Sequence, residues 1–281
     1  MDTFYKDADI CLKNISSLKQ TKYSADIRID AHISELAYTL SKLLPKGFSE
    51  EIADGYRSIF ADITKELDCK QRLLLYGHTA KNEPCLTFAE KLTEMGRKKK
   101  NASAVYVKNA LGDLAFERFS KHFDKLSVYY ADDFESALED VYYSKADYTI
   151  IPISSSKNGR LLHFNDLILR YEMKICMKCS VHSNTDDSES EFLLLSKNAE
   201  VFGNRDGLHF EFLLSDPQKS LISVLKAAQQ YGCEYVSSFT FPEKDHAVIE
   251  LDISQGDINA LCLYLFLEFP RHIPMGIYNV I

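Results

Sequence analysis

This 281-residue chain lacks tryptophan, internal repeats, low-complexity segments and any long hydrophobic run. Its longest apolar stretch, INALCLYLFLEF, is far shorter than the roughly 20 residues of a membrane-spanning helix. The seven cysteines are scattered and odd in number, which argues against a secreted disulfide framework and predicts a reducing, cytoplasmic location. The start, MDTFYKDADI, is acidic and has no apolar core, so no signal peptide is visible in it.

Basic residues are also fewer than acidic ones. The chain has 33 Lys and Arg residues against 41 Asp and Glu residues, a formal net charge of −8. We therefore expect neither nucleic acid nor an anionic membrane as a partner. Hydrophobic residues make up 46% of the chain, which is ordinary for a globular protein that buries a sizeable core. The length predicts two or three domains.

Residues 1–72 are predicted to be helical. Within DAHISELAYTLSKLL the apolar residues form one helical stripe, and Pro45 and Gly47 break it. Ser49 then caps a second amphipathic helix. These two helices predict an αα-hairpin preceded by a less regular leader.

From Leu73 the pattern becomes that of an α/β lobe. Predicted strands alternate with predicted helices, and the short links between them favour a parallel sheet. The strands are LLLYG, SAVYV, KLSVYY and DYTIIPI, and the helices are LTFAEKLTEMGRKKK, LGDLAFERFSKHF and DDFESALEDVYYS. DLILRYEMKICMKCSV continues through a helix into another strand, and FLLLS is a strand that follows a polar loop.

Residues 207–281 predict a separate unit. Strands are expected at LHFEFLL, EYVSSFTF, HAVIELDI and MGIYNVI, with helices at KSLISVLKAAQQYG and DINALCLYLFLEF. The order β-α-β-β-α-β is that of a ferredoxin-like fold.

The run from Val105 to Ser180 resembles the first lobe of prephenate dehydratase. Where that family has Gly-Thr-Phe-Ser-Glu, this chain has Gly112–Phe116, and where the family has Pro-Ile-Glu-Asn-Ser it has Pro152–Ser156. Residues 207–281 resemble the ACT domain that follows. GFSEEIADGYRSIFADITKELDCKQ resembles the last helix of the chorismate mutase domain fused ahead of many dehydratases.

The resemblance implies a bifunctional chorismate mutase/prephenate dehydratase ancestry in phenylalanine biosynthesis. It divides the chain into a helical mutase-like remnant at 1–72, a dehydratase-like lobe at 73–200 and an ACT domain at 207–281. The lobe would correspond to half of a periplasmic-binding-protein-like dehydratase. The family's second lobe should follow Pro152–Ser156, but only Lys157–Glu189 fills that interval, so we expect it to be almost wholly missing.

Substitutions argue against catalysis. The family's Thr-Arg-Phe motif is Ser190-Glu191-Phe192 here, so an acid replaces the cation. A like charge beside a dianionic substrate costs about 1 kcal/mol at 4 Å in water and about 4 kcal/mol at an intermediate dielectric. Asp113 adds a second negative charge at a helix start that would otherwise attract an anion.

The resemblance also supplies candidate site residues. Ser190 and Gln71 are the catalytic candidates, Gln71 because it falls at the mutase glutamine, although it also fits a plain helix-end residue. The ligand-binding candidates come from the strand end, the helix start and the ACT effector motifs: Ser154, Ser155, Ser156, Asp113, Lys219, Ser220, Leu221 and Thr240. Lys219 replaces a family glycine that lets the backbone approach a bound amino acid, and so obstructs that approach.

No cofactor or metal is expected. Cys176 and Cys179 have CxxC spacing but no second ligand pair. Residues three apart in a strand face opposite sides, which predicts one core cysteine and one surface cysteine rather than a zinc site.

Three functions stay open. The substitutions favour a degenerate dehydratase-like protein that senses a small anionic metabolite or an amino acid, or regulates as a homodimer formed through its ACT domain. The second is an active dehydratase or mutase with substituted site residues, completed by another subunit. The third is an ACT dimerisation scaffold without a ligand.

Overall fold

The computed structural model describes residues 2–42, 50–82, 101–183, 188–203, 205–241 and 245–281. The chain divides into two compact units, Met1–Cys85 and Leu86–Ile281. Among the described residues, no helix is long and apolar enough to cross a membrane.

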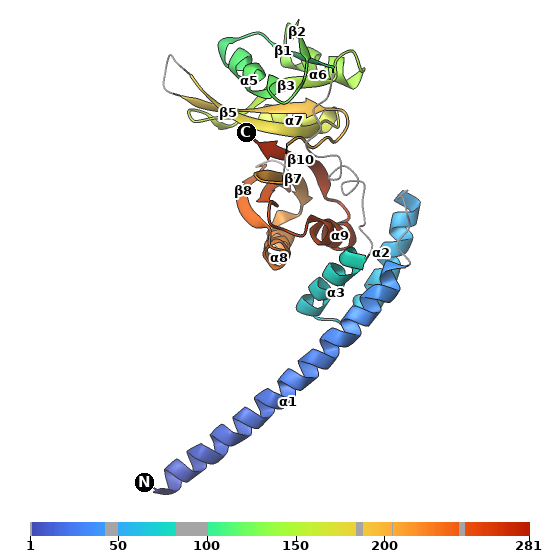
Figure 1. The fold of residues 1–281 in the computed structure, drawn as a ribbon, viewed down its shortest axis with the longest axis vertical. Coiled ribbons are helices and arrows are strands. Elements are labelled where there is room, and N and C mark those ends of the chain that lie inside the picture. The colour runs from blue at the N-terminus through green and yellow to red at the C-terminus, as the bar shows by residue number, and fades with distance from the viewer. Residues whose placement is uncertain (1, 43–49, 83–100, 184–187, 204, 242–244) are drawn as a thin grey trace. The chain divides into compact units, whose positions relative to one another are not determined.

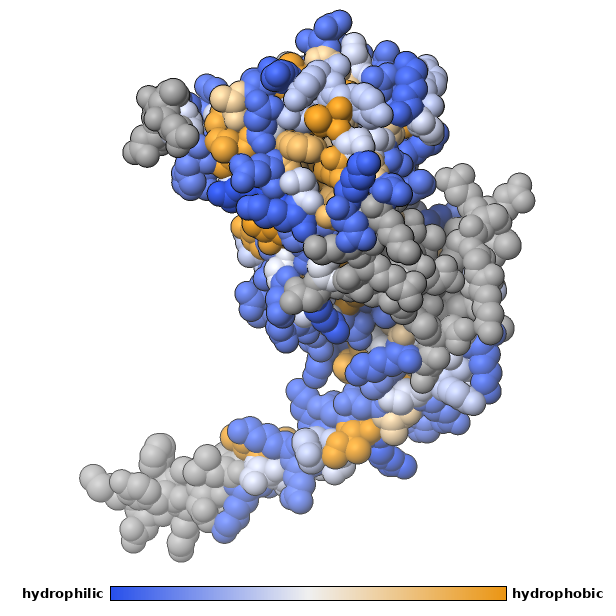
Figure 2. Space-filling view, turned by 45° about the horizontal axis from the view of Figure 1, so that its top comes forward, coloured by the Kyte–Doolittle hydropathy of each residue, from blue (hydrophilic) through white to orange (hydrophobic). Residues whose placement is uncertain are grey.

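The first unit consists of helices α1 (Asp2–Ser41), α2 (Glu50–Thr64) and α3 (Cys69–Asn82) (Figure 1). The predicted helical N-terminal segment is confirmed, but the less regular leader is wrong because α1 runs through it for 40 residues. The end of α1 packs on α3, and Ile33, Ala37 and Leu40 are buried there. Figure 2 shows apolar residues among the polar ones on the coloured, described part of this helix.

Helix α3 overturns the strand predicted for LLLYG. The Asp68 carboxylate accepts a hydrogen bond from the Gln71 backbone N–H at 2.9 Å, and the Gln71 side-chain oxygen accepts one from the Asp68 N–H at 3.0 Å. This reciprocal pair is a capping box, which starts a helix. Buried Leu73, Tyr76 and Ala80 then recur at helical spacing, a period that a short apolar run does not reveal. The segment Leu73–Cys85 therefore belongs to the helical unit.

The second unit is built on one sheet, whose described strands follow the order β2-β1-β3-β6-β5-β10-β7-β9-β8, with β4 paired to β3. Its first part comprises β1 (Ala102–Val107), α5 (Ala110–Ser120), β2 (Leu126–Ala131), α6 (Phe134–Tyr142), β3 (Tyr148–Ser155), β4 (Gly159–Arg160), α7 (Leu162–Arg170), β5 (Lys174–His182) and β6 (Glu189–Ser196). These elements confirm the predicted α/β lobe from SAVYV onward. The helix predicted within residues 86–100 lies outside the described residues.

Strands β2, β1 and β3 are parallel, whereas β6 runs antiparallel between β3 and β5. Helix α5 covers one face of this lobe and buries Ala115 and Phe119 against it. Helices α6 and α7 cover the other face through residues such as Leu138 and Leu167. The sheet is thus covered on both sides, which explains its almost continuously apolar strands.

The remaining elements are β7 (Leu208–Ser215), α8 (Pro217–Gln230), β8 (Glu234–Thr240), β9 (His246–Asp252), α9 (Ile258–Glu268) and β10 (Ile273–Val280). Their order, β-α-β-β-α-β, confirms the predicted ferredoxin-like arrangement. This C-terminal unit is joined to the lobe through β5 and β10, which lie side by side and pair in parallel at Met177–Asn279 and Lys178–Val280 (Figure 1).

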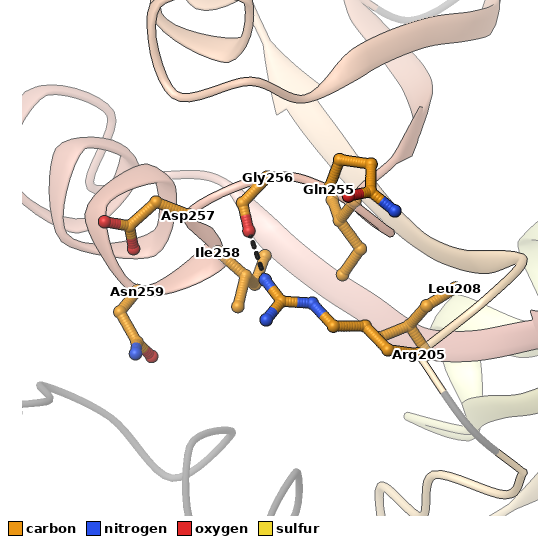
Figure 3. A pocket seen from close by; sticks show the side chains of 8 residues that line it. Arg205, Leu208, Gln255, Gly256, Asp257, Ile258 and Asn259 are labelled. Atoms are coloured by element: carbon orange, nitrogen blue, oxygen red, sulfur yellow. Dashed lines mark hydrogen bonds between the residues drawn. The ribbon is translucent and has the colours of Figure 1, made fainter.

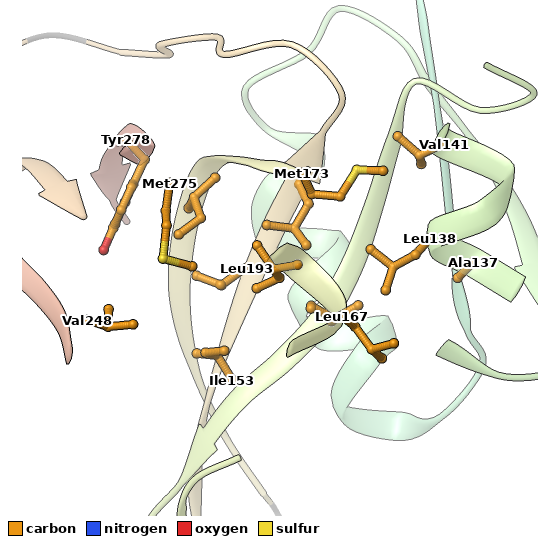
Figure 4. Close-up of a cluster of buried hydrophobic side chains, with 14 of the residues drawn as sticks. Ala137, Leu138, Val141, Ile153, Leu167, Met173, Leu193, Val248, Met275 and Tyr278 are labelled. Carbon is orange, nitrogen blue, oxygen red and sulfur yellow. The ribbon is translucent and has the colours of Figure 1, made fainter. Parts of the chain in front are cut away.

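Two features tighten this junction. A Cβ atom on Gly276 would lie 2.3 Å from the Ile175 carbonyl oxygen, so the close approach of β10 to β5 requires glycine. A single apolar core also crosses the junction: Figure 4 shows Val248, Met275 and Tyr278 at one end of a cluster that reaches Val141 of α6. The lobe and the C-terminal unit therefore share one core.

The predicted opposite orientation of Cys176 and Cys179 is wrong. The pairing of β5 with β6 shifts between Ile175 and Met177, which leaves Cys176 as the extra residue of a β-bulge. Cys176 and Cys179 consequently enter the same buried cluster. Burial raises the pKa of the Cys179 thiol to about 12, so it stays protonated at neutral pH.

Candidate functional site

The end of β3 and the start of β6 bring several predicted site residues together. Ser155 lies directly opposite Ser190 in the sheet. The hydroxyl oxygen of Ser155 accepts a hydrogen bond from the Asn158 backbone at 3.1 Å, and that of Ser156 accepts one from the Glu189 backbone at 3.0 Å. The strand end is therefore held by its own turn and by β6, and Ser190, opposite it in the sheet, is buried.

Glu191, which the resemblance assigns to an arginine position, is engaged by two neighbours. The Ser154 hydroxyl donates a hydrogen bond to Glu191 Oε2 at 2.5 Å. The Lys178 ammonium lies 3.0 Å from Glu191 Oε1. A cation is thus present beside this strand end, but it is already paired with the acid.

The same ammonium reaches the C-terminal unit. Lys178 Nζ lies 3.3 Å from Glu250 Oε1 on β9. The Glu250 carboxylate also contacts His209 Nδ1 at 2.9 Å and accepts a hydrogen bond from the Ser237 hydroxyl at 3.0 Å. Lys178 therefore bridges a carboxylate of the lobe and a carboxylate of the C-terminal unit.

A second bridge runs parallel to the first. Glu211 on β7 lies directly opposite Glu250 on β9, where two like charges would repel each other. Arg160 Nη2 lies 2.6 Å from Glu211 Oε1, and the Tyr278 hydroxyl lies 2.9 Å from Glu211 and 3.0 Å from Glu250. We call Arg160, Lys178, Glu191, Glu211 and Glu250, with the side chains that bond to them, the ionic network.

The pKa shifts show strong coupling within the ionic network. Burial opposes the charged form of Glu250, but the His209 hydrogen bond and the Lys178 charge outweigh it and lower the pKa of Glu250 to about 2. Burial likewise opposes the charged forms of Lys178 and Arg160, yet the facing carboxylates leave the pKa of each raised. Glu250, Lys178 and Arg160 are therefore held charged in a buried setting, where removal of one member is costly.

Sequence reasoning missed Lys178 and Glu250 because they are far apart in the chain and each sits in an apolar strand. The available signal was a charged residue within a predicted buried strand, Lys178 in KICMKCSV and Glu250 in HAVIELDI. A charged side chain in a strand that is covered on both faces has no access to solvent and needs a partner of opposite charge. Arg160 gave no such signal, because an arginine directly after Gly159 also fits an ordinary exposed turn residue.

The helix start at Asp113 is internally satisfied. The Asn109 side chain caps α5 by accepting from the Gly112 N–H at 2.8 Å, and the Asp113 N–H bonds to the Asn109 carbonyl at 2.9 Å. The Asp113 carboxylate accepts a hydrogen bond from the Tyr106 hydroxyl at 2.7 Å. This helix start holds a carboxylate of its own chain.

Gln71 belongs to the other unit, Met1–Cys85, where its side chain forms the capping box of α3. That contact gives it a structural role, and its catalytic role stays a prediction.

The ACT-motif candidates gather at one end of the C-terminal unit. Lys219 is exposed and pairs with Asp216 at 2.7 Å, and the buried Ser220 hydroxyl donates to the Asp216 carbonyl at 2.6 Å. Leu221 follows in the first turns of α8, and Thr240 ends the neighbouring edge strand β8. Asp216 has a left-handed backbone with φ of 51°, which its short polar side chain tolerates.

A pocket lies at the opposite end of the same unit, between the start of β7 and the start of α9. It has a volume of about 530 Å³, within the usual range for small-molecule sites, and its apolar lining comes from Leu208, Ile253 and Ile258. Arg205 Nη2 donates to the Gly256 carbonyl at 2.7 Å. Figure 3 shows this guanidinium meeting the loop before α9, with Asp257 and Asn259 also lining the pocket.

The pocket offers a cation, an anion and amides beside apolar groups. Asp257 caps α9 by accepting from the Ala260 N–H at 3.1 Å, so its carboxylate is held at the helix start. Among the described residues, no group of three or more His, Cys, Asp or Glu side chains could hold a metal ion. The pocket's chemistry therefore suits a small organic ligand that carries both charges.

No family model matches this chain, and no curated protein matches it. Solved structures do resemble it. The prephenate dehydratase of Streptococcus mutans is similar with a TM-score of 0.51 at 11% identity, over 64% of this chain and 98% of that chain. The chain thus has a prephenate dehydratase-like fold.

Two further solved structures have lower scores. The prephenate dehydratase of Arthrobacter aurescens in complex with L-Phe has a TM-score of 0.49 at 12% identity, over 63% of this chain and 90% of that chain. GqqA, described as a novel type of quorum quenching acylase, has a TM-score of 0.47 at 15% identity, over 63% of this chain and 94% of that chain.

Proposed function

We propose that this chain is a non-catalytic relative of prephenate dehydratase that senses a small ligand in aromatic amino-acid metabolism. The observation that carries the proposal is the pairing of Glu191 with Lys178 and Ser154. At this position the dehydratase family has an arginine, and a dianionic substrate needs cations and donors around its carboxylates. Here the donor and the cation are bound to an acid of the chain itself.

Admission of a dianion at this strand end would require Lys178 to leave Glu191, and it would bring the ligand's charge close to Glu250. The Lys178 side chain is 9% exposed but the Glu191 side chain is 32% exposed, so separating this half-buried pair costs at most about 3 kcal/mol, which corresponds to a loss of affinity of up to roughly 10²-fold. The ionic network therefore disfavours dehydratase chemistry more strongly than the Arg-to-Glu difference alone.

The pocket at Arg205 is the proposed place for the ligand. An α-amino acid matches its charges: the carboxylate would meet Arg205, and the ammonium would meet the Asp257 carboxylate at the start of α9. The apolar side chain of the ligand would then lie on Leu208, Ile253 and Ile258. We further propose that the C-terminal unit is an ACT domain, and its ligand would bind at the end opposite to the family's effector motifs.

The test is isothermal titration of the full-length chain with the proteinogenic amino acids and with shikimate-pathway acids. We expect an amino acid with an apolar side chain to bind, and Arg205→Gln to weaken it about 10- to 100-fold, as loss of a charged hydrogen bond implies. Arg271→Gln, which changes an exposed arginine of the same unit, is the matched control and should bind normally.

Absence of binding by every compound would favour the ligand-free scaffold and end the sensor proposal. Binding that Arg205→Gln leaves unchanged would place the ligand elsewhere, for example at Lys219–Leu221.

A further inference from the structure

Strand β2 is an edge of the sheet that the described strands form. It pairs with β1 without a bulge from Leu126 to Ala131. This segment contains no proline and no charged side chain, and none of its residues is fully buried. Proteins usually protect an edge strand with such features, because its unpaired backbone groups can pair with a further strand. The β2 edge therefore lacks the usual protection.

The other edge of the described sheet, β8, is protected. Its pairing with β9 shifts between Tyr235 and Ser237, which marks a β-bulge, and an acidic residue, Glu234, stands at its start. A bulge and a charge are both devices that keep an edge from pairing. The chain thus protects one edge of its sheet and leaves the other open.

Two tyrosines of β2 extend into solvent on opposite faces of this edge. Tyr129 is 57% exposed and Tyr130 is 52% exposed. The Tyr130 ring packs edge-on against Tyr106, on the face of the sheet that α5 covers, so Tyr129 lies on the other face. Tyrosine is enriched at protein interfaces, because its ring is apolar while its hydroxyl can stay wet. The edge therefore offers aromatic surface on both faces.

The hydrogen bonds to β1 show which backbone groups of β2 face outward. The Ala102 N–H donates to the Lys125 carbonyl at 3.0 Å, so the backbone of Lys125 faces β1. Because this direction alternates along a strand, the N–H and C=O groups of Leu126, Val128 and Tyr130 point away from β1. A further strand would bond to these three residues.

We propose that the β2 edge pairs with the β2 edge of a second copy of this chain, in the antiparallel direction, so that the two sheets become one. Two-fold symmetry requires residues with outward-facing groups to meet one another. This holds when Tyr129 lies opposite the partner's Tyr129, because Val128 then bonds to the partner's Tyr130.

Charge favours this partner and this register. The exposed Lys125 lies opposite the partner's Asp133, which is also exposed, and two-fold symmetry repeats the ion pair at the other end. The neighbouring register, with Val128 opposite the partner's Val128, would set Asp124 against the partner's Asp132, where like charges repel. The stretch DKLSVYYADD is therefore complementary to itself in the proposed register.

Disulfide trapping of the full-length chain tests the proposal. Facing residues of a non-hydrogen-bonded antiparallel pair have Cα atoms about 4.5 Å apart, which a disulfide can span. Tyr129→Cys should therefore link two copies under mild oxidation, and mass spectrometry of the joined peptides identifies the link. The matched control is Tyr143→Cys, because Tyr143 is 66% exposed on the same lobe but lies at the end of α6. The control should link at least about 10-fold more slowly, since it depends on chance collision.

Two second substitutions show whether the link depends on strand pairing. Val128→Pro, added to Tyr129→Cys, removes an outward-facing N–H, a position where an edge strand tolerates proline, and should abolish the link. Lys125→Glu changes an exposed side chain, so it serves even if the proline disturbs the fold. It should slow the linking roughly 5-fold, because two ion pairs are lost. The proposal is overturned if Tyr129→Cys links no faster than Tyr143→Cys, or if Lys125→Glu leaves the rate unchanged.

Discussion

Replacement of Lys178 by methionine tests the ionic network. Methionine keeps an unbranched apolar side chain, so the change removes the charge while leaving much of the packing in place. The Glu191 and Glu250 carboxylates, which lie 3.0 and 3.3 Å from the ammonium, would then lose their shared cation. Loss of one partner from a buried ion pair costs about 3–5 kcal/mol. For a unit of this size that amounts to a fall in Tm of roughly 6–20 °C.

The assay is urea unfolding followed by circular dichroism, with Lys219→Met as the matched control. Lys219 is an exposed lysine with a single surface partner, and its loss should cost less than about 1 kcal/mol. The double variant Lys178→Met/Glu250→Gln should recover part of the loss, because it removes one of the stranded charges. Equal stability of Lys178→Met and Lys219→Met would refute the view that the buried Lys178–Glu250 pair of the ionic network stabilises the fold.

Three further predictions concern other parts of the chain. The pKa of Glu250 is lowered from 4.5 to about 2 in the folded state, so its contribution of about 3 kcal/mol to stability is complete above pH 4.5 and is lost as the pH falls towards 2. The variant Glu250→Gln lacks this carboxylate and should therefore unfold in acid at a higher pH than the wild type. An unchanged midpoint pH of acid unfolding would contradict this. Gly276→Ala should destabilise the protein by about 1–3 kcal/mol or more in thermal unfolding, because the added Cβ meets the Ile175 backbone. The control Gly55→Ala, at an open position in a helix, should be neutral or stabilising. Similar effects of the two substitutions would show that the junction between β10 and β5 is not tightly packed. Gln71→Ala should cost about 1 kcal/mol of stability through loss of the capping box, and an effect on mutase activity without any effect on stability would instead assign Gln71 to catalysis.

The strands and helices from SAVYV onward were predictable because their apolar periods are clear and their turns carry glycine, proline or acidic caps. The failures have identifiable physical causes. LLLYG is too short for its period to separate a strand from a helix, and the capping box formed by Asp68 and Gln71 decided the outcome. The bulge at Cys176 cannot be read from alternation, since a bulge is what breaks it.

The candidate site was predictable only in part. The resemblance assigned Ser154 and Ser190 to the candidate site, and the structure brings the two strand ends that carry them together. It could not reveal that Lys178 pairs with Glu191 and Glu250, because that contact depends on how β10 joins β5 and thereby carries β9 towards the lobe. The Arg205 pocket depends on the same kind of long-range placement.

Turnover of prephenate is the decisive measurement for the ionic network's role. Purified protein would be mixed with prephenate and followed by phenylpyruvate absorbance, with an active dehydratase as the positive control. We predict a rate no higher than that of the uncatalysed reaction. A clear rate that Ser190→Ala abolishes would show that the strand end admits and processes the dianion despite the pairing of Glu191 with Lys178.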